Sequence, residues 1–328
     1  MYDMHYDLLT ILYFNFLHGN KCANLKKCIK DIEGVYSRNN IRGGIINLYF
    51  MDEKEMEWEL GIPKKLLNDV PYMFKESIKI LNRFKAEKII PKNTNFLYSI
   101  EGCDYIKNER ELEELYNLGL RSILLTWNTK NKYGSGLRSH RGLTLKGKKF
   151  MKKAIDLGIM IDLSHANPRT FNGIIKVIKK EQKKGKEVHV IASHSNCKSL
   201  CDRKRNLTDK QLIALKDVGG IIGVFSNSNF LSTNAENMNH EERMEKYVEH
   251  IKYVMELGFT ADKIVLSTDD MNFDPDSSFY NLETFELKTI KNETEKLLKK
   301  HFDEETVNKL MCETAIKLIR QLNKKKKK

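Results

Sequence analysis

Short apolar runs alternate with longer amphipathic stretches along the chain. Eight of the runs, rich in Ile, Val, Leu or Tyr, are typical of strands buried on both faces: residues 2–8, 43–50, 95–100, 121–126, 158–163, 187–192, 219–225 and 263–267. The stretches between them carry apolar residues three and four positions apart, which predicts helices over residues 63–85, 109–118, 145–157, 168–184, 208–218, 240–257 and 283–301. Thr208 and Gln211 fit a capping box, and Gly158, Gly219 and Gly258 stand where helices should end.

The number and order of these elements indicate the fold class. Eight strands that alternate with helices over about 300 residues predict an α/β protein built as a (β/α)8 TIM barrel. A doubly wound open sheet is the structural alternative, but no glycine-rich phosphate-binding motif follows any predicted strand. Because the chain has only five prolines and no low-complexity linker, we expect one barrel domain over residues 1–323 and a disordered polylysine tail over 324–328.

Composition excludes several classes of protein. Hydrophobic residues make up 41% of the chain, enough for a large core, which excludes wholesale disorder. The sequence lacks the long apolar run of a membrane span, and its first residues lack the basic start and small-residue cleavage site of a secretory signal. We therefore expect a cytoplasmic protein with no membrane partner. We also expect reduced thiols at all six cysteines, which form no CxxC pair: Cys22, Cys28, Cys103, Cys197, Cys201 and Cys312.

The formal net charge of +13 raises the question of nucleic-acid binding. Five of the positive charges belong to the tail at 324–328, and many others are lysines on predicted helices, as in residues 176–187. Specific nucleic-acid sites rely on clustered arginines and interleaved aromatic residues, and neither pattern occurs here. We interpret the charge as a solvated, lysine-rich surface and expect no nucleic-acid partner.

Histidines and carboxylates follow the predicted strands at the ends that would meet at one rim of a barrel. His5 and Asp7 are two positions apart in the first strand, so they share a face and can bind one ion together, with Asp3 one step deeper to orient the His5 ring. Glu101 ends the third strand, and His165 and His194 end the fifth and sixth. If Glu101 bridges, these residues supply two three-ligand sets that suit zinc.

The alternative for any single strand-end histidine is a hydrogen-bonded structural role, but five such groups at four strand ends favour the metal interpretation. Asp162 has the opposite strand parity from His165, so we expect it to point away from the ions. We assign no chemistry to the six other histidines, which fall in helices, loops or mid-strand: His18, His140, His189, His240, His250 and His301.

The chain resembles the renal dipeptidase family, also called membrane dipeptidases (peptidase family M19), among the metal-dependent amidohydrolase-like barrels. The resemblance rests on segments that run in family order over nearly the whole chain: Asp3-Met-His5-Tyr-Asp7-Leu8, Gly43-Gly44, Ile100-Glu101-Gly102, Asn117-Leu-Gly119-Leu-Arg121, Gly142-Leu143-Thr144, Asp162-Leu163-Ser164-His165, Ser193-His194-Ser195, Arg205-Asn206 and Thr268-Asp269.

The resemblance implies a role for several of these residues. His5 and Asp7 would bind the first of two zinc ions, His165 and His194 the second, and Glu101 both. Arg205 matches the arginine that holds the free carboxylate of the substrate, and Asp269 matches the catalytic aspartate beside the bridging water and the substrate amine.

Two segments depart from the kidney-type enzymes. Trp127, followed by Asn128, replaces a histidine that contacts the reacting carbonyl, although Leu-Thr-Trp-Asn resembles a bacterial branch of the family. We place Trp127 and Asn128 at the substrate site. The segment Asp269-Asp270-Met271-Asn272 keeps only the first aspartate of the family's Asp-Phe-Asp-Gly pattern.

The resemblance implies a binuclear zinc dipeptidase that acts on small peptides, tolerates a D-residue at the C-terminal position and forms a homodimer. Two alternatives stay open. One is a barrel hydrolase that acts on another small amide or lactam, with its pocket altered around Trp127. The other is a catalytically silent binding protein on the same fold.

Overall fold

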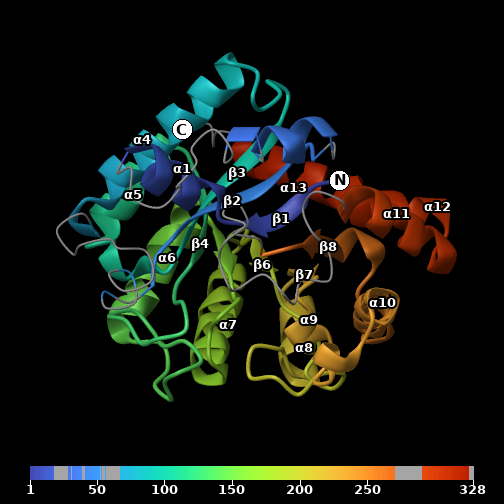
Figure 1. Ribbon diagram of the computed structural model, residues 1–328. Helices are drawn as coiled ribbons and strands as arrows, with labels where there is room; N and C mark the ends of the chain where they lie inside the picture. Colours follow the sequence, from blue (N-terminus) through green and yellow to red (C-terminus); the bar gives the residue numbers. More distant parts are fainter. Residues whose placement is uncertain are drawn as a thin grey trace.

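The computed structural model describes residues 1–17, 29–30, 32–38, 41–51, 53, 56, 67–269 and 290–324. Its eight strands are all parallel, and they pair in sequence order within one sheet that curls into a barrel (Figure 1). The strands are β1 (Asp3–Tyr6), β2 (Gly43–Tyr49), β3 (Asn95–Glu101), β4 (Leu120–Leu124), β5 (Met160–Asp162), β6 (Val190–Ala192), β7 (Ile221–Phe225) and β8 (Ile264–Ser267). All eight predicted strands are present, with small shifts at their ends, so the TIM-barrel prediction is confirmed.

The seam between the first and last strands closes the barrel and excludes the open sheet. The backbone N–H of Asp269, just after β8, donates to the His5 carbonyl at 3.0 Å. Asp3 adds side-chain bonds across the same seam, because its Oδ1 accepts from the Thr268 N–H at 3.0 Å and its Oδ2 accepts from the Thr268 hydroxyl. On the other side of β1, a Cβ at Gly44 would lie 1.6 Å from the Asp3 carbonyl oxygen, so only glycine fits this close approach.

Helices cover the outside of the barrel (Figure 1). They are α1 (Leu8–Leu17), α4 (Val70–Ala86), α5 (Glu109–Leu118), α6 (Leu145–Leu157), α7 (Pro168–Gln182), α8 (Asp209–Asp217), α9 (Ser228–Leu231), α10 (His240–Glu256), α11 (Ile290–His301), α12 (Glu304–Asn308) and α13 (Thr314–Asn323). The seven predicted helices correspond to α4 to α8, α10 and α11, although residues 63–66 and 283–289 of the predicted ranges lie outside the described residues. The predicted capping box at Thr208 and Gln211 is confirmed, and Gly158 ends α6 in the left-handed conformation.

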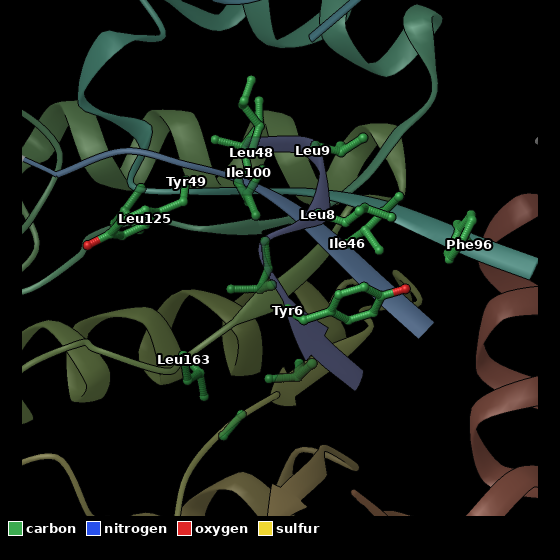
Figure 2. Packing of buried hydrophobic residues seen from close by; sticks show 14 of the residues in the cluster. Tyr6, Leu8, Leu9, Ile46, Leu48, Tyr49, Phe96, Ile100, Leu125 and Leu163 are labelled. Carbon is green, nitrogen blue, oxygen red and sulfur yellow. The ribbon is translucent and has the colours of Figure 1, made fainter. Parts of the chain in front are cut away.

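Two apolar layers hold the fold together. The larger layer lies between the strands and the surrounding helices and includes Tyr6, Leu48 and Leu163 (Figure 2). The smaller layer fills the barrel interior with residues from the strands: Tyr2, Met4, Ile45, Leu97, Met160, Ile191, Ile221 and Val265. Residues of α13, such as Leu318 and Leu322, belong to this inner layer and close the N-terminal end of the barrel. The opposite end, where the strands finish, is therefore left for a site.

None of the helices that the structure describes combines the length and the apolar character needed to cross a membrane. The expected disorder of the polylysine tail concerns residues that, beyond Lys324, lie outside the described part of the chain.

Candidate metal centre

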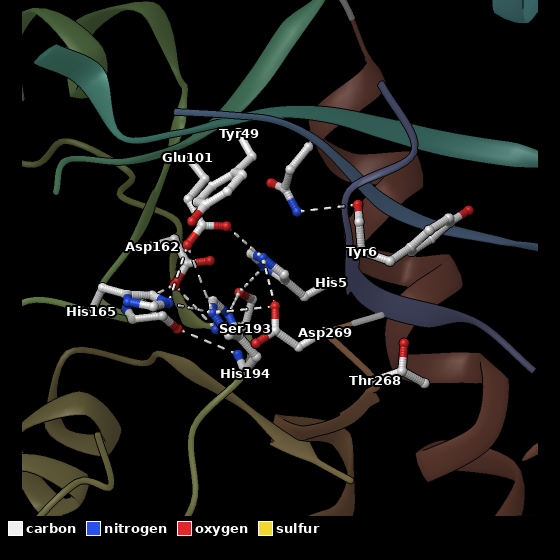
Figure 3. Close-up of polar contacts among 12 residues, drawn as sticks. His5, Tyr6, Tyr49, Glu101, Asp162, His165, Ser193, His194, Thr268 and Asp269 are labelled. Carbon is white, nitrogen blue, oxygen red and sulfur yellow. Dashed lines mark hydrogen bonds and ion pairs between the residues drawn. The ribbon is translucent and has the colours of Figure 1, made fainter. Parts of the chain in front are cut away.

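The polar residues that follow the strands meet at the C-terminal mouth of the barrel (Figure 3). His5 comes from β1 and Glu101 from the end of β3, while His165 and His194 follow β5 and β6. Asp7 lies between β1 and α1. The side chains of all five predicted ligands are buried, with 8% exposure at His165 and less at the others.

Glu101 lies at the middle of this cluster and faces different histidines with its two oxygens. Its Oε2 is 2.8 Å from His5 Nε2, whereas its Oε1 is 3.1 Å from His165 Nε2 and 3.9 Å from His194 Nε2. The Nε2 atoms of His165 and His194 are themselves 3.0 Å apart. Two ligand atoms on one tetrahedral zinc are about 3.3 Å apart when their bonds to the metal are about 2.0 Å long. The observed spacing therefore fits a shared cation.

Three groups of ligand atoms lie within 4.8 Å of one another among the described residues. The first contains His5, Asp7 and Glu101, and the second contains Glu101, His165 and His194. These are the two sets proposed from the sequence, and they share Glu101. The third group joins His5, His194 and Asp269, so Asp269 lies beside the centre, although neither of the two sets that share Glu101 needs it.

The Nδ1 atom of each histidine, which faces away from the centre, contacts a polar side chain. Asn128 Oδ1 lies 2.9 Å from His165 Nδ1. The hydroxyl of Ser193 lies 2.7 Å from His5 Nδ1 and 2.8 Å from His194 Nδ1, so one serine contacts two of the predicted ligands. An acceptor at Nδ1 favours the tautomer with the proton on Nδ1, which leaves the Nε2 lone pair directed into the centre.

Burial and neighbouring charges set the protonation of the cluster. Burial holds the pKa of His165 and His194 well below the usual value, so both rings are neutral. Burial also lowers the pKa of His5, but the carboxylates of Glu101 and Asp269 outweigh it and raise this pKa to about 9. The lone pairs of His165 and His194 and the charge of Glu101 thus converge on one point, and a divalent cation bound there would displace the proton of His5.

Two residues of the cluster adopt left-handed backbone conformations that are uncommon for side chains other than glycine. The φ angle is 62° at His165 and 59° at Asp269. Such strained conformations persist where the surrounding structure holds them, as it does in many functional sites. At His165 the turn directs the ring into the centre.

Asp269 faces the histidines, as its position after β8 predicts. Its Oδ1 lies 3.7 Å from His5 Nε2 and 3.9 Å from His194 Nε2. Burial raises the pKa of Asp269 to about 7, and the nearby His5 and Glu101 act on it in opposite directions. The carboxyl is therefore able to take and release a proton near neutral pH. Asp270, Met271 and Asn272 lie outside the described residues.

The structure corrects the expected positions of Asp162 and Asp3. Asp162 points into the barrel below the centre, because it shares the face of Met160, and its Oδ1 accepts from the backbone N–H of Ser164 and Ser193. The parity argument fails because the left-handed turn at His165 breaks the alternation after β5. Asp3 accepts from the His5 backbone N–H at 3.2 Å and bonds across the β1–β8 seam, and it is Ser193 that contacts the His5 ring.

Arg205 is buried beside His194, as a substrate-binding residue would be. Its guanidinium donates to the His194 carbonyl at 2.7 Å and to the Ser195 hydroxyl at 3.2 Å. These bonds occupy two of the five N–H donors of the group and fix its plane. Burial lowers its pKa, while Asp269 and Glu101 favour the charged form, so the guanidinium remains a cation.

Trp127 and Asn128, which are adjacent in the sequence, make different contacts in the site. The Trp127 ring lies 6.2 Å from the His165 ring and 5.6 Å from the Tyr49 ring, measured between centroids, so it forms part of the wall of the site. Asn128 contacts His165 Nδ1 and is placed to orient that ring. Its role as a substrate-binding residue stays a prediction.

Sequence reasoning missed Ser193 and the wall residue Tyr49, which Figure 3 shows beside Glu101. Ser193 directly follows β6 and precedes a predicted ligand, and that position is the only signal that could have found it. Histidines without assigned chemistry include His250, which is buried and packs as a structural residue. Its Nδ1 accepts from the Cys197 N–H and its Nε2 lies 3.1 Å from the Leu231 carbonyl.

A parallel barrel with imidazoles and carboxylates gathered at its C-terminal mouth is the architecture of the amidohydrolase-like barrels. Within that class, the chain belongs to the membrane dipeptidase family, peptidase family M19, whose sequence profile matches residues 65–328. The match begins after β1 and β2, so the places of His5 and Asp7 in the centre rest on the structure.

Comparisons with individual proteins agree with this family. An uncharacterized protein of Acinetobacter calcoaceticus is 29% identical over 189 residues, which is 55% of this chain and 56% of that protein. Dipeptidase verJ of Clonostachys rogersoniana is 32% identical over 165 residues, which is 48% of this chain and 38% of that protein. The matches therefore span 56% and 38% of the length of these two relatives.

A metallo peptidase of Rhodobacter sphaeroides shares the fold. Its structure, solved with a phosphinate mimic of the dipeptide L-Ala-D-Ala, superposes on 98% of this chain and 98% of its own, with a TM-score of 0.68 and 19% sequence identity.

Proposed function

We propose that the chain is a binuclear zinc-dependent dipeptidase. The observation that carries this proposal is the placement of Glu101, whose two oxygens face His5 on one side and His165 and His194 on the other. A carboxylate in this position joins two three-ligand sets, and three imidazoles with two carboxylates suit zinc better than magnesium or calcium.

His5, Asp7 and Glu101 would hold one ion, and Glu101, His165 and His194 would hold the other. Two zinc ions so held would lower the pKa of a shared water toward about 7 and polarise the scissile carbonyl. The chain then has two further tasks, which are to move a proton and to orient the peptide.

Asp269 is the group that moves the proton. Its carboxylate faces the histidines, and its pKa of about 7 lets it accept a proton from the attacking water and donate it to the leaving amine. Arg205 binds the free carboxylate of the peptide, because a fixed guanidinium offers paired donors that match a carboxylate. This contact limits the substrates to short peptides with a free C-terminus.

The Rhodobacter sphaeroides protein, whose ligand mimics L-Ala-D-Ala, supports a dipeptide with a D-residue at the C-terminal position as substrate. The experiment is a panel of L-Ala-L-Ala, L-Ala-D-Ala, N-acetyl-alanine and a β-lactam, assayed with protein of measured metal content. We expect hydrolysis of the dipeptides, with loss on chelation and recovery with zinc. Hydrolysis of only the acylated or lactam substrates would favour the alternative amide hydrolase. Two bound zinc ions without turnover of any substrate would favour a silent binding protein.

A further inference from the structure

A cavity of about 380 Å³ opens beside the centre on the side of Arg205. His165 and Arg205 reach it from the centre, and Arg169, Lys198 and Lys204 line its outer part. None of the described residues that line it is Asp or Glu. The volume is within the range of small-ligand pockets. The pocket beside the group that should bind the C-terminal carboxylate is therefore positively charged.

The side-chain amides of this pocket already form hydrogen bonds with the protein. Asn167 donates to the carbonyls of Ser139 and Arg141, and Asn206 donates to the carbonyls of Cys201 and Phe230. Gln211 is held in the capping box of α8. Apart from His140, the cations are thus the groups that remain to select a ligand.

The cations themselves are not equivalent. Lys198 forms an ion pair with Asp202, and Arg169 donates to the His140 carbonyl at 3.1 Å. Lys204 is exposed and has no carboxylate within ion-pair distance among the described residues. Under the proposed function, Arg205 binds the α-carboxylate of the dipeptide. Lys204 and Arg169 then supply additional positive charge, and a dipeptide with neutral side chains has no second carboxylate to pair with it.

A second cavity, on the outside of the barrel, is also lined by positively charged residues. It has a volume of about 600 Å³, lies between α6 and α7, and shares Arg169 with the first. Its other cations are Lys148, Lys152, Lys176 and Lys180, and no described residue that lines it is acidic. A surface of one sign that leads to a site raises the local concentration of ligands of the opposite sign.

We infer that the preferred substrates are dipeptides whose C-terminal residue carries a second carboxylate, namely aspartate or glutamate. Arg205 would bind the α-carboxylate, and Lys204 with Arg169 would bind the side-chain carboxylate. This inference rests on the proposed function and deepens it, because it names the substrate class of the same site.

The test compares kcat/KM for isosteric pairs that differ by one charge: Ala-Glu against Ala-Gln, and Ala-Asp against Ala-Asn, each with an L- and a D-residue at the C-terminal position. We expect the acidic member to be preferred by roughly 10- to 100-fold, which is the usual effect of a charge-assisted bond. Glu-Ala against Gln-Ala, with the charge at the other end, should show no such preference.

Substitutions of Lys204 test whether the preference for an acidic C-terminal residue arises from this pocket. Lys204→Met should reduce the Glu-to-Gln ratio, with part of the preference retained by Arg169, and Lys204→Glu should reverse the preference in favour of Ala-Lys over Ala-Gln. Lys210→Met, an exposed lysine on α8 that does not line the cavity, is the matched control and should leave the ratio unchanged. Ratios near one in the wild-type enzyme, or a ratio unaffected by Lys204→Glu, would overturn the inference.

The two proposals fail in distinguishable ways. Turnover of Ala-Ala without any preference for acidic residues would leave the dipeptidase in place and remove only the inference. No turnover of any dipeptide by zinc-loaded protein would remove both.

Discussion

Replacing Ser193 with alanine should weaken the binding of both metal ions at once. The Ser193 hydroxyl is fully buried and lies 2.7 Å from His5 Nδ1 and 2.8 Å from His194 Nδ1. Of the two ligand sets that share Glu101, His5 belongs to one and His194 to the other. A hydroxyl oxygen has two lone pairs, so it can accept from both Nδ1–H groups, while its own proton turns toward the adjacent Asp162 carboxylate. Burial raises the pKa of Asp162, and the contact with Ser193 offsets part of that rise. One oxygen therefore holds both rings in the tautomer that binds metal.

The magnitude follows from these contacts. Loss of a hydrogen bond behind a metal-binding histidine typically costs 10- to 100-fold in affinity, so we expect roughly that loss at each ion in Ser193→Ala. Asn128→Ala is the matched control, because Asn128 contacts only His165 and should weaken one ion while leaving the other unchanged. Ser193→Thr keeps the hydroxyl and should retain more of the affinity than alanine.

The assay is a titration of metal-free protein with zinc against a chromophoric chelator, which gives both dissociation constants. Circular dichroism and the melting temperature would show that the variants are folded. If Ser193→Ala bound both ions with unchanged affinity, or lost affinity for only one, the shared role of the hydroxyl would be refuted.

The other predictions concern the remaining groups of the centre. Glu101→Gln should lower the zinc content from about two per chain and abolish hydrolysis, because a neutral amide cannot hold two cations together; full activity with two ions bound would contradict the binuclear centre. Arg205→Met should raise KM far more for a dipeptide than for its C-terminal amide, and equal losses would show that Arg205 does not bind the carboxylate. Asp269→Asn should retain both ions while kcat falls by roughly 100-fold or more, and a near-normal kcat would exclude it as the proton carrier. Zinc added to metal-free protein should release about one more proton per chain at pH 8 than at pH 10, because His5, whose pKa is about 9, is protonated only at the lower pH, while the shared water loses its proton at both. An indicator-dye titration measures it, and a release that does not change with pH would contradict this assignment.

Sequence patterns were sufficient to predict the barrel because each strand is an apolar run bounded by amphipathic helices. They missed α1, whose residues Leu8–Leu17 are apolar on nearly every side and therefore lack a helical period. They also missed α13, although its buried residues Ala315, Leu318, Ile319 and Leu322 have the three- and four-residue spacing of an amphipathic helix. The tertiary surroundings, rather than the local pattern, therefore identify α1, whereas the pattern itself was sufficient to predict α13.

The candidate site was predictable to the extent that it depends on strand ends. His5, Glu101, His165 and His194 converge because parallel strands finish at one rim. The direction of Asp162 and the contacts of Ser193 were not predictable, since they depend on the left-handed turn at His165 and on packing between neighbouring strands. The role of Arg205 came from the family resemblance, because its place beside His194 depends on a loop of irregular backbone.

The seam between β1 and β8 has a consequence for how the protein folds. The contact between His5 and Ser193 joins residues 188 positions apart in the chain, and the bond between Asp3 and Thr268 joins residues 265 apart. Closing such long loops is slow and entropically costly, so the mouth of the barrel should form late, after the interior strands have paired. Zinc should then slow unfolding much more than it speeds folding, because the ligands are assembled only after the transition state. Stopped-flow folding with and without zinc tests this, and equal acceleration of folding by zinc would indicate that the ligands meet early.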